Sequence, residues 1–203
     1  MMKLYYSPGS CSLAAHILIR ELELRVEIER VSLSTKKTAS GEDFLKINPK
    51  GYVPALLLDD GAVLTEGLAV LEYLGDQSPK AALVPAPGSM RRYRLHEWLT
   101  FIGTELHKSF SPLFDPAMSE DVKVHTRERL AARLAYVAWQ LDRTPHLLGD
   151  QFTATDAYLF TVLRWARFVR LDLSPWPSII AHHERILGRP HVQAALKAEN
   201  LLR

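Results

Sequence analysis

A proline-rich segment separates two parts of this chain that have different sequence patterns. Four residues that interrupt regular structure fall between positions 78 and 89: Pro79, Pro85, Pro87 and Gly88. Before this segment the apolar residues change between strand-like and helical spacing, whereas after it glycine is scarce and helical spacing dominates. Because domains are often joined where composition shifts in this way, we expect two domains and a linker, at residues 1–80, 89–203 and 81–88 respectively.

The first part has the pattern of a mixed α/β unit. We expect a strand, a helix and a strand, then a short helix, a hairpin and a closing helix. Their expected ranges are, in that order, 3–6, 12–22, 26–33, 43–47, 55–58, 62–64 and 68–75. The pair Asp60-Gly61 marks the hairpin turn. A helix that connects two parallel strands, followed by a hairpin and a helix, makes a compact layered unit of the order β-α-β, β-β-α.

The second part is expected to be all-helical. Helical spacing extends over five ranges: 89–113, 119–141, 153–169, 175–187 and 190–201. Thr153 and Asp156 have the spacing of a capping box, and the residues after them are apolar enough for a central, buried helix. The fold class predicted from the sequence is therefore α/β plus all-α.

The composition excludes several classes of protein. The chain has 203 residues, of which 47% are hydrophobic and 24% charged, and its formal net charge is +2. These values are typical of an ordinary soluble globular protein. No apolar stretch reaches the roughly 18 residues of a membrane helix, and no secretory signal is evident, so we expect a cytoplasmic protein without a membrane partner. Arginines cluster at positions 91–94 and 164–170, but no nucleic-acid-binding motif accompanies them. His182, His183 and His191 lack the spacing of metal ligands. We therefore expect no nucleic-acid partner and no metal.

The only cysteine of the chain, Cys11, stands between the first expected strand and the first expected helix. The sulfur should lie near the unpaired N–H groups that begin this helix, which favour a thiolate over a thiol. The alternative is that Cys11 is a small buried hydrophobic residue. Since there is no second cysteine, disulfide chemistry here would need a thiol from another molecule.

Two further motifs of the first part have the character of a peptide-binding site. Pro54 stands directly before an expected central strand, where Val53 could offer its backbone N–H and C=O to an extended peptide; the alternative is an ordinary loop end. Glu66 and Gly67 lie at a helix start, which attracts a carboxylate, and Glu66 could bind an amino group. The alternative for Glu66 is a helix cap. Together with Cys11, these groups would suit a cysteine-containing peptide.

In the second part, polar residues line one face of the first expected helix. Thr100, Thr104, His107 and Lys108 follow helical spacing. This stripe is either solvated surface or the wall of a cleft between the domains, where His107 could act on a sulfur. Trp165 is a candidate wall for a hydrophobic substrate, with core packing as its alternative.

Five motifs, in order along both parts, resemble those of beta-class bacterial glutathione S-transferases. They are Ser-Pro-Gly-Ser-Cys-Ser-Leu at 7–13, Asn-Pro-Lys-Gly-Tyr-Val-Pro-Ala-Leu at 48–56, Leu-Thr-Glu-Gly at 64–67, Glu-Leu-His-Lys at 105–108 and Phe-Thr-Ala-Thr-Asp-Ala-Tyr at 152–158. The resemblance implies a thioredoxin-like N-terminal domain, an all-helical C-terminal domain and a homodimer. It also implies a cis Pro54, with Val53 pairing to the cysteinyl part of glutathione and Glu66 and Gly67 holding its γ-glutamyl end.

The resemblance further implies roles for individual side chains. Cys11 would lie beside the glutathione sulfur and could form a mixed disulfide, and His107 would be the active-site histidine. Gly67 and Thr100 stand where many members have Ser and Asn. The expected catalytic residues are Cys11 and His107, the expected second-substrate residue is Trp165, and the expected glutathione-binding set is Cys11, Lys36, Tyr52, Val53, Pro54, Glu66, Gly67, Thr100, Thr104, His107 and Lys108.

The function expected from this resemblance is the conjugation of glutathione, as a co-substrate, to hydrophobic electrophiles. Mixed-disulfide chemistry at Cys11 could accompany it. Two alternatives remain: a glutathione-dependent thiol-disulfide oxidoreductase, and a dimer that binds apolar ligands without catalysis. No separate cofactor is expected.

Overall fold

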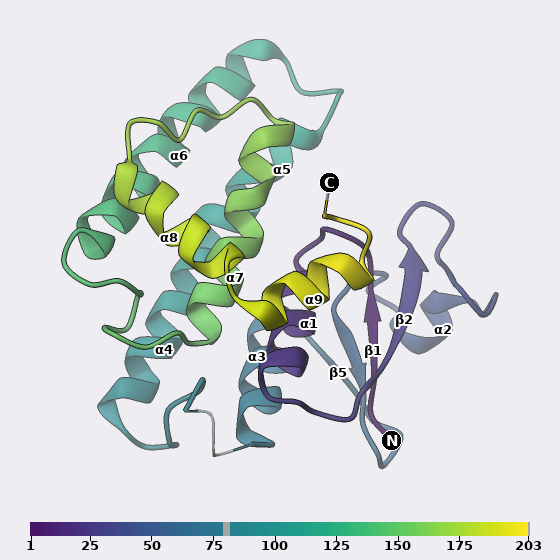
Figure 1. The fold of residues 1–203 in the computed structure, drawn as a ribbon. Coiled ribbons are helices and arrows are strands. Elements are labelled where there is room, and N and C mark those ends of the chain that lie inside the picture. Colours follow the sequence, from purple (N-terminus) through teal and green to yellow (C-terminus); the bar gives the residue numbers. More distant parts are fainter. Residues whose placement is uncertain (79–81, 203) are drawn as a thin grey trace. The chain divides into compact units, whose positions relative to one another are not determined.

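The computed structural model describes residues 1–78 and 82–202, and it divides the chain into two compact units. The first unit contains residues 1–84 together with 188–203, and the second contains residues 85–187 (Figure 1). The last helix thus belongs to the first unit, whereas the sequence assigns it to the helical domain. Of the expected linker at 81–88, residue 81 lies outside the described residues, as does Pro79, while Leu83 and Val84 are buried.

The first unit is built on a five-stranded sheet with the order β3-β2-β1-β4-β5. The strands are β1 (Lys3–Tyr6), β2 (Glu27–Ser32), β3 (Lys37–Thr38), β4 (Ala55–Leu57) and β5 (Val63–Thr65). Strands β1 and β2 are parallel, and the other pairs are antiparallel. The hairpin between β4 and β5 turns at Asp60-Gly61, as the sequence predicts: Gly61 has φ +87°, and the Asp60 carboxylate accepts a hydrogen bond from the amide of Ala62. The short strand β3 lies in a polar stretch where the sequence predicts none.

Four helices accompany this sheet: α1 (Ser12–Glu21), α2 (Phe44–Ile47), α3 (Gly67–Asp76) and α9 (Pro190–Ala198). The apolar face of α1, which includes Leu13 and Ile17, is fully buried. Helix α9 packs beside α1 (Figure 1). Arg189 fixes this arrangement with two hydrogen bonds of 2.6 and 2.7 Å to the carboxylate of Glu21.

A second, fully buried contact joins the C-terminal segment to α1. The Nδ1 atom of His16 lies 2.9 Å from one carboxylate oxygen of Glu199, and the other oxygen accepts a hydrogen bond of 2.9 Å from the amide of Gly9. Gly9 has φ +71°, a conformation that favours glycine. The C-terminal segment therefore holds the turn that precedes Cys11.

The second unit is helical. Its elements are α4 (Met90–Phe101), a π-helix η2 (Ile102–His107), α5 (Lys108–Phe114), α6 (Glu120–Leu141), α7 (Ala154–Leu163), a 3₁₀-helix η3 (Arg164–Phe168) and α8 (Pro177–Leu187). Every residue of α7 is buried, which agrees with the predicted central helix. The sequence predicts single helices over 89–113 and 153–169, whereas the structure inserts a π-helical segment into the first and ends the second with a 3₁₀-helix.

The capping box predicted at Thr153 and Asp156 is present at the start of α7. The Asp156 carboxylate accepts hydrogen bonds from the amide and the hydroxyl of Thr153, at 2.8 and 3.0 Å. This side chain is fully buried, so its remaining acceptor sites also need partners inside the unit.

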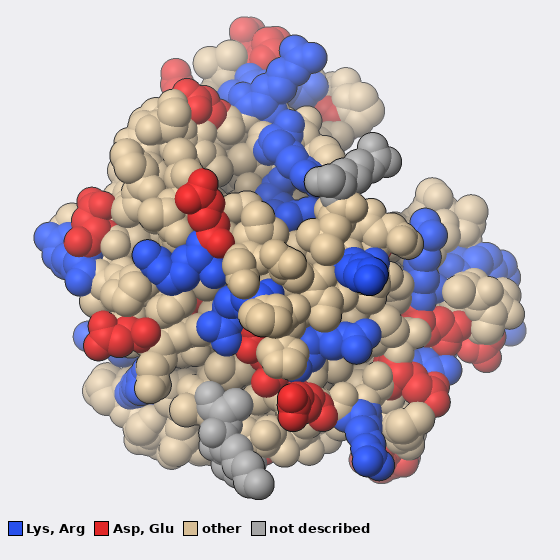
Figure 2. Space-filling model, viewed as in Figure 1, with Lys and Arg blue, Asp and Glu red and all other residues tan. Residues whose placement is uncertain are grey.

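Two features of the molecule as a whole follow from its composition. On the face drawn in Figure 2, lysine and arginine side chains lie among acidic and uncharged ones, as a formal net charge of +2 leads one to expect. Among the described helices, none combines the length and the apolar character needed to cross a bilayer.

Candidate functional site

Cys11 lies at the N-terminus of α1, where its side chain is partly exposed. Its thiol donates to the carbonyl oxygen of Val53 across 3.1 Å. The buried hydroxyl of Ser12 holds the turn before it, because it accepts from the amide of Ser7 at 3.1 Å and lies 2.8 Å from the hydroxyl of Ser10. The helix start favours a thiolate, whereas the hydrogen bond to Val53 stabilises the thiol. Cys11 is therefore not a buried core residue, and losing that contact would favour its ionisation.

The loop at 48–54 is organised by the buried side chain of Asn48. Its amide nitrogen donates to the carbonyl oxygen of Tyr52 at 2.7 Å, and its side-chain oxygen accepts from the amide of Lys50 at 3.2 Å. The Tyr52 side chain itself is exposed. Asn48 thus sets the course of the backbone that leads into Val53.

The peptide bond between Val53 and Pro54 is cis, as the family resemblance implies. Among the described residues, Val53 makes one hydrogen bond, through its carbonyl oxygen to Cys11, and its amide N–H has no partner. Val53 itself is 6% exposed. Because β4 begins at Ala55, an extended peptide could pair with this backbone as an additional short strand.

Lys36 reaches the same loop from the turn between β2 and β3. Its ammonium group donates to the carbonyl oxygen of Gly51 at 2.9 Å and lies 5.7 Å from the centre of the Tyr52 ring. Gly51 has φ +68°, which suits glycine at this tight turn. The expected ligand contact Lys36 is thus adjacent to the backbone that carries Val53.

Glu66 and Gly67 stand at the start of α3. Glu66 is the N-cap residue of α3, as the cap alternative expects, but its side chain makes no capping hydrogen bond to the helix. Its carboxylate pairs instead with the Lys50 ammonium group at 2.6 Å and is largely exposed. A Cβ atom at Gly67 would lie 3.9 Å from the ring of Pro54, an ordinary van der Waals contact, so this position has room for a serine, the residue that the family resemblance leads one to expect here.

In the second unit, the best-defined candidate is His107, the last residue of the π-helix. Its Nδ1 lies 2.7 Å from the hydroxyl oxygen of Tyr158, a buried residue of α7, and its ring packs edge-on against Trp165 at 4.8 Å. Burial, with a smaller effect of the Lys108 charge, lowers the pKa of His107 to about 4. The imidazole is therefore neutral at pH 7.

The other residues of the polar stripe are exposed. Thr100, Thr104 and Lys108 all face solvent, and the Thr104 hydroxyl donates to the backbone carbonyl of Thr100 at 3.0 Å. Trp165 is 7% exposed and packs in the unit against aromatic rings of α5. Its burial agrees with the core alternative, while its contact with His107 keeps it next to a candidate catalytic group.

Comparison with known proteins identifies the family. Two family models match: the N-terminal domain of glutathione S-transferases at residues 9–77, and their C-terminal domain at residues 101–190. Glutathione S-transferase GstA of Escherichia coli O157:H7 is 48% identical over 200 residues, which cover 98% of this chain and 100% of the relative. The chain belongs to the glutathione S-transferase family.

Solved structures of this family resemble the chain throughout its length. A sphingomonad glutathione S-transferase complexed with glutathione has a TM-score of 0.95 and 46% identity, covering 98% of this chain and 100% of that one. A beta-class glutathione S-transferase from Sphingomonas chungbukensis has the same TM-score and coverage, with 45% identity. The resemblance to the beta class is thereby confirmed, as is the fold class: a thioredoxin-like N-terminal domain and an all-helical C-terminal domain.

The first unit brings together several of the residues that the sequence analysis expects to bind glutathione. Cys11 contacts Val53, Lys36 approaches Tyr52, and Gly67 lies near Pro54. Three contributors in the two units were not among the expected site residues: Ser12, Asn48 and Tyr158. All three lie in the family motifs, at 7–13, 48–56 and 152–158 respectively, so their positions carried a signal. Their hydrogen-bond partners, however, come from the fold.

Proposed function

We propose that the protein is a glutathione transferase that binds glutathione on its first unit and conjugates it to hydrophobic electrophiles. The observation that carries this proposal is the backbone of Val53: its carbonyl oxygen accepts from the Cys11 thiol, and its amide has no partner among the described residues. A cysteinyl peptide that pairs with Val53 would bring its own sulfur close to Cys11. The glutathione complex of the sphingomonad relative supports the choice of peptide.

The charged groups around Val53 suit the two ends of glutathione. The tripeptide has an ammonium group and a carboxylate at its γ-glutamyl end and a second carboxylate at its glycyl end. Glu66 offers a carboxylate for the ammonium group, and the start of α3 at Gly67 offers backbone N–H groups for the adjacent carboxylate. Lys36 supplies a positive charge on the other side of the loop. These groups bind and orient the tripeptide, while Val53 fixes its register.

His107 is proposed to act on the glutathione thiol as a neutral imidazole. We propose that the Tyr158 hydroxyl donates to Nδ1, 2.7 Å away, which leaves the ring proton on Nε2, from where it can be donated to the sulfur. A hydrogen bond to the charged form lowers a thiol pKa from about 8.5 and increases the thiolate that attacks the electrophile. The carbon–sulfur bond forms as the leaving group departs with its electron pair.

A second candidate function is thiol-disulfide exchange at Cys11. Its exposure and the absence of any other cysteine in the chain favour exchange with a small molecule. The Cys11 thiolate would attack the glutathionyl sulfur of a mixed disulfide between glutathione and another thiol, and it would release that thiol as a thiolate. Free glutathione would then attack the Cys11–glutathione disulfide, restore the Cys11 thiol and leave as glutathione disulfide. Both activities can coexist on one glutathione site.

We also propose a homodimer, in keeping with the family resemblance, and a cytoplasmic location, in keeping with a chain that has one cysteine and so cannot form an internal disulfide. An aromatic surface of the second unit supports the dimer. The rings of Trp98 and Tyr136 stack at 5.5 Å, those of Tyr136 and Trp139 stack at 5.8 Å, and Tyr136 and Trp139 are about half exposed. Exposed aromatic groups of this kind are enriched where a partner binds, and a second copy of the chain is the partner proposed.

An activity panel tests these assignments. Wild type, Cys11→Ala and His107→Ala would be assayed for conjugation of a halogenated nitroarene and for reduction of a glutathione mixed disulfide, with the exposed His125→Ala as a matched control. We expect His107→Ala to lower conjugation, Cys11→Ala to abolish exchange, and His125→Ala to change neither. A wild type that binds glutathione but catalyses neither reaction would favour the ligand-binding alternative, and one that does not bind it would refute the proposal.

A further inference from the structure

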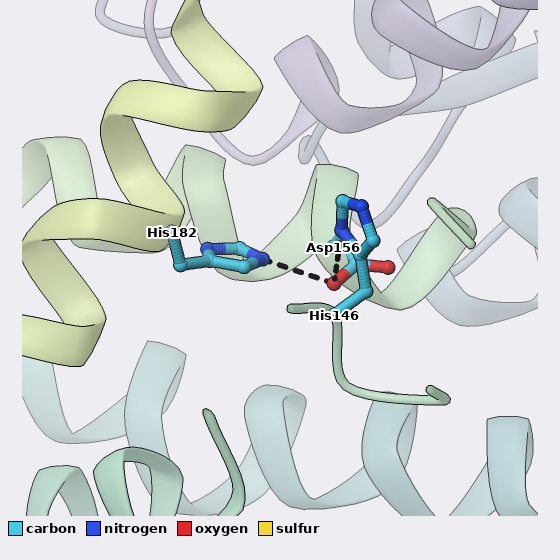
Figure 3. A group of neighbouring side chains, drawn as sticks. All are labelled: His146, Asp156 and His182. Carbon is cyan, nitrogen blue, oxygen red and sulfur yellow. Dashed lines mark hydrogen bonds and ion pairs between the residues drawn. The ribbon is translucent and has the colours of Figure 1, made fainter. Parts of the chain in front are cut away.

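Three side chains of the second unit converge at a place that the proposed transferase chemistry does not use. His146 follows α6, Asp156 lies in the first turn of α7, and His182 lies in α8. Figure 3 shows both imidazole rings directed at the same carboxylate oxygen. The Nε2 atom of His182 lies 2.9 Å from Oδ1 of Asp156, and Nδ1 of His146 lies 3.6 Å from it. Three metal-binding atoms, one from each residue, all lie within 4.8 Å of one another.

The cluster is buried and incompletely satisfied. His182 and Asp156 are fully buried, and His146 is 7% exposed. Among the described residues, neither Nδ1 of His146 nor Nδ1 of His182 has a hydrogen-bond partner. The first of these two atoms is the one directed at Asp156. A buried polar atom without a partner is costly. Among the described residues, the cluster therefore has a ring nitrogen without a hydrogen bond, 3.6 Å from a carboxylate oxygen.

The two carboxylate oxygens of Asp156 accept hydrogen bonds from different partners. Oδ2 accepts both hydrogen bonds from Thr153, which begin α7. Oδ1 accepts from the amide of Leu147 at 3.0 Å and from His182. Oδ1 is thus the oxygen that lies nearest both imidazole rings, at 2.9 Å from His182 and 3.6 Å from His146. An ion bound at Oδ1 would leave the helix cap at Oδ2 intact.

We propose that His146, Asp156 and His182 bind a divalent transition-metal ion of the Zn²⁺ class. Zinc bonds of about 2.0–2.2 Å to nitrogen and carboxylate oxygen set neighbouring ligand atoms of a tetrahedron roughly 3.4 Å apart. The two nitrogen–oxygen distances here are 2.9 and 3.6 Å, and the two ring nitrogens lie within 4.8 Å of each other. Nδ1 of His146 and Nε2 of His182 would be the nitrogen ligands, and a water would complete the tetrahedron. When the ion binds, the one ring proton of His182 moves from Nε2, where it lies between His182 and Asp156, to Nδ1.

The ion would have a structural role. It joins the segment after α6 to the start of α7 and to α8, three parts of the second unit that are separate in sequence. The sequence predicts no metal here because the ligands are 10 and 26 residues apart and do not follow a compact ligand motif. The proposal does not depend on glutathione binding.

Cobalt substitution tests the site in the full chain, prepared without a histidine tag, stripped with a chelator and assayed without glutathione. Titration with Co²⁺ should produce the visible bands of a tetrahedral complex, saturating at one ion per chain, and Zn²⁺ should abolish them. Zn²⁺ should also raise the melting temperature of wild type. We expect His146→Gln to weaken Co²⁺ binding by more than the roughly 10–100-fold that a change outside the ligand set costs.

Two matched controls separate this site from others. The exposed His125→Gln and the active-site Cys11→Ala should both keep the cobalt spectrum unchanged. If His182→Gln fails to fold, His146→Gln still decides, since its ring lies in a loop after α6 and is slightly exposed. The proposal is overturned if wild type gives no tetrahedral cobalt spectrum, if the spectrum persists in His146→Gln, or if it disappears in Cys11→Ala.

Discussion

Replacing Asp156 with alanine is expected to destabilise the unit of residues 85–187 severely. Four donors lose the acceptor Asp156, and one of them, the Thr153 hydroxyl, still has the Thr155 hydroxyl 2.7 Å away. Three are left without an acceptor: the amides of Thr153 and Leu147 and the Nε2 atom of His182. A buried donor that loses its partner costs about 1–3 kcal/mol, so the three together amount to about 3–9 kcal/mol. We expect the free energy of unfolding to fall by at least the lower value, which exceeds the roughly 0.5–2 kcal/mol of an ordinary helix cap.

Tryptophan fluorescence during urea unfolding is the suitable assay. All four tryptophans of the chain lie at positions 98, 139, 165 and 176, inside this unit. The measurement would be made with a chelator present, so that metal binding does not contribute. Asp121→Ala, in the exposed first turn of α6, is the matched control and should cost no more than about 1 kcal/mol. A loss below about 3 kcal/mol for Asp156→Ala would refute this account of α7.

Three further predictions concern other parts of the molecule. The pKa of His107 is lowered to about 4 from 6.5, so as the pH falls the imidazole takes up a proton in the unfolded chain before it does so in the folded chain. Acidification from pH 7 to 5 should therefore lower the free energy of unfolding by about 2 kcal/mol. Urea unfolding of His107→Gln should not show this loss. Gly75→Ala would place a Cβ 2.1 Å from a methyl carbon of Val84, so circular dichroism should report a loss of about 1–3 kcal/mol or more, and an unchanged midpoint would contradict the packing. Glu199→Ala removes the carboxylate that accepts from the Gly9 amide. We expect it to lower the melting temperature and to raise the KM for glutathione. A lower melting temperature with an unchanged KM would contradict the link between Glu199 and the turn before Cys11.

Features with local causes were the ones predictable from the sequence. The hairpin at Asp60-Gly61 and the capping box at Thr153 and Asp156 depend on residues close together in the chain. The apolar spacing of α1 likewise predicts a buried helix face. In each of these places short-range preference and long-range packing favour the same structure.

Features with distant causes were not predictable in this way. Helix α9 joins the first unit through Arg189 and Glu21, which are 168 residues apart. The π-helix interrupts a stretch whose spacing is helical throughout, and single-residue changes in helical hydrogen bonding leave little trace in the apolar pattern. The contacts of the candidate site are also between residues far apart in the sequence. The thiol of Cys11 is hydrogen-bonded to Val53, 42 residues away, and His107 is hydrogen-bonded to Tyr158, 51 residues away. The motif resemblance, not periodicity, identified the residues of the first unit that come together.

Amide hydrogen exchange at Val53, followed by nuclear magnetic resonance with and without glutathione, tests the central claim most directly. The N–H of Val53 has no partner among the described residues, and the proposed pairing with the cysteinyl part of glutathione gives it one. We predict that saturating glutathione slows exchange at Val53 strongly, while the amide of Ala62 in the distant hairpin turn exchanges at an unchanged rate. Glutathione binding that leaves the exchange rate of Val53 unaltered would contradict the account.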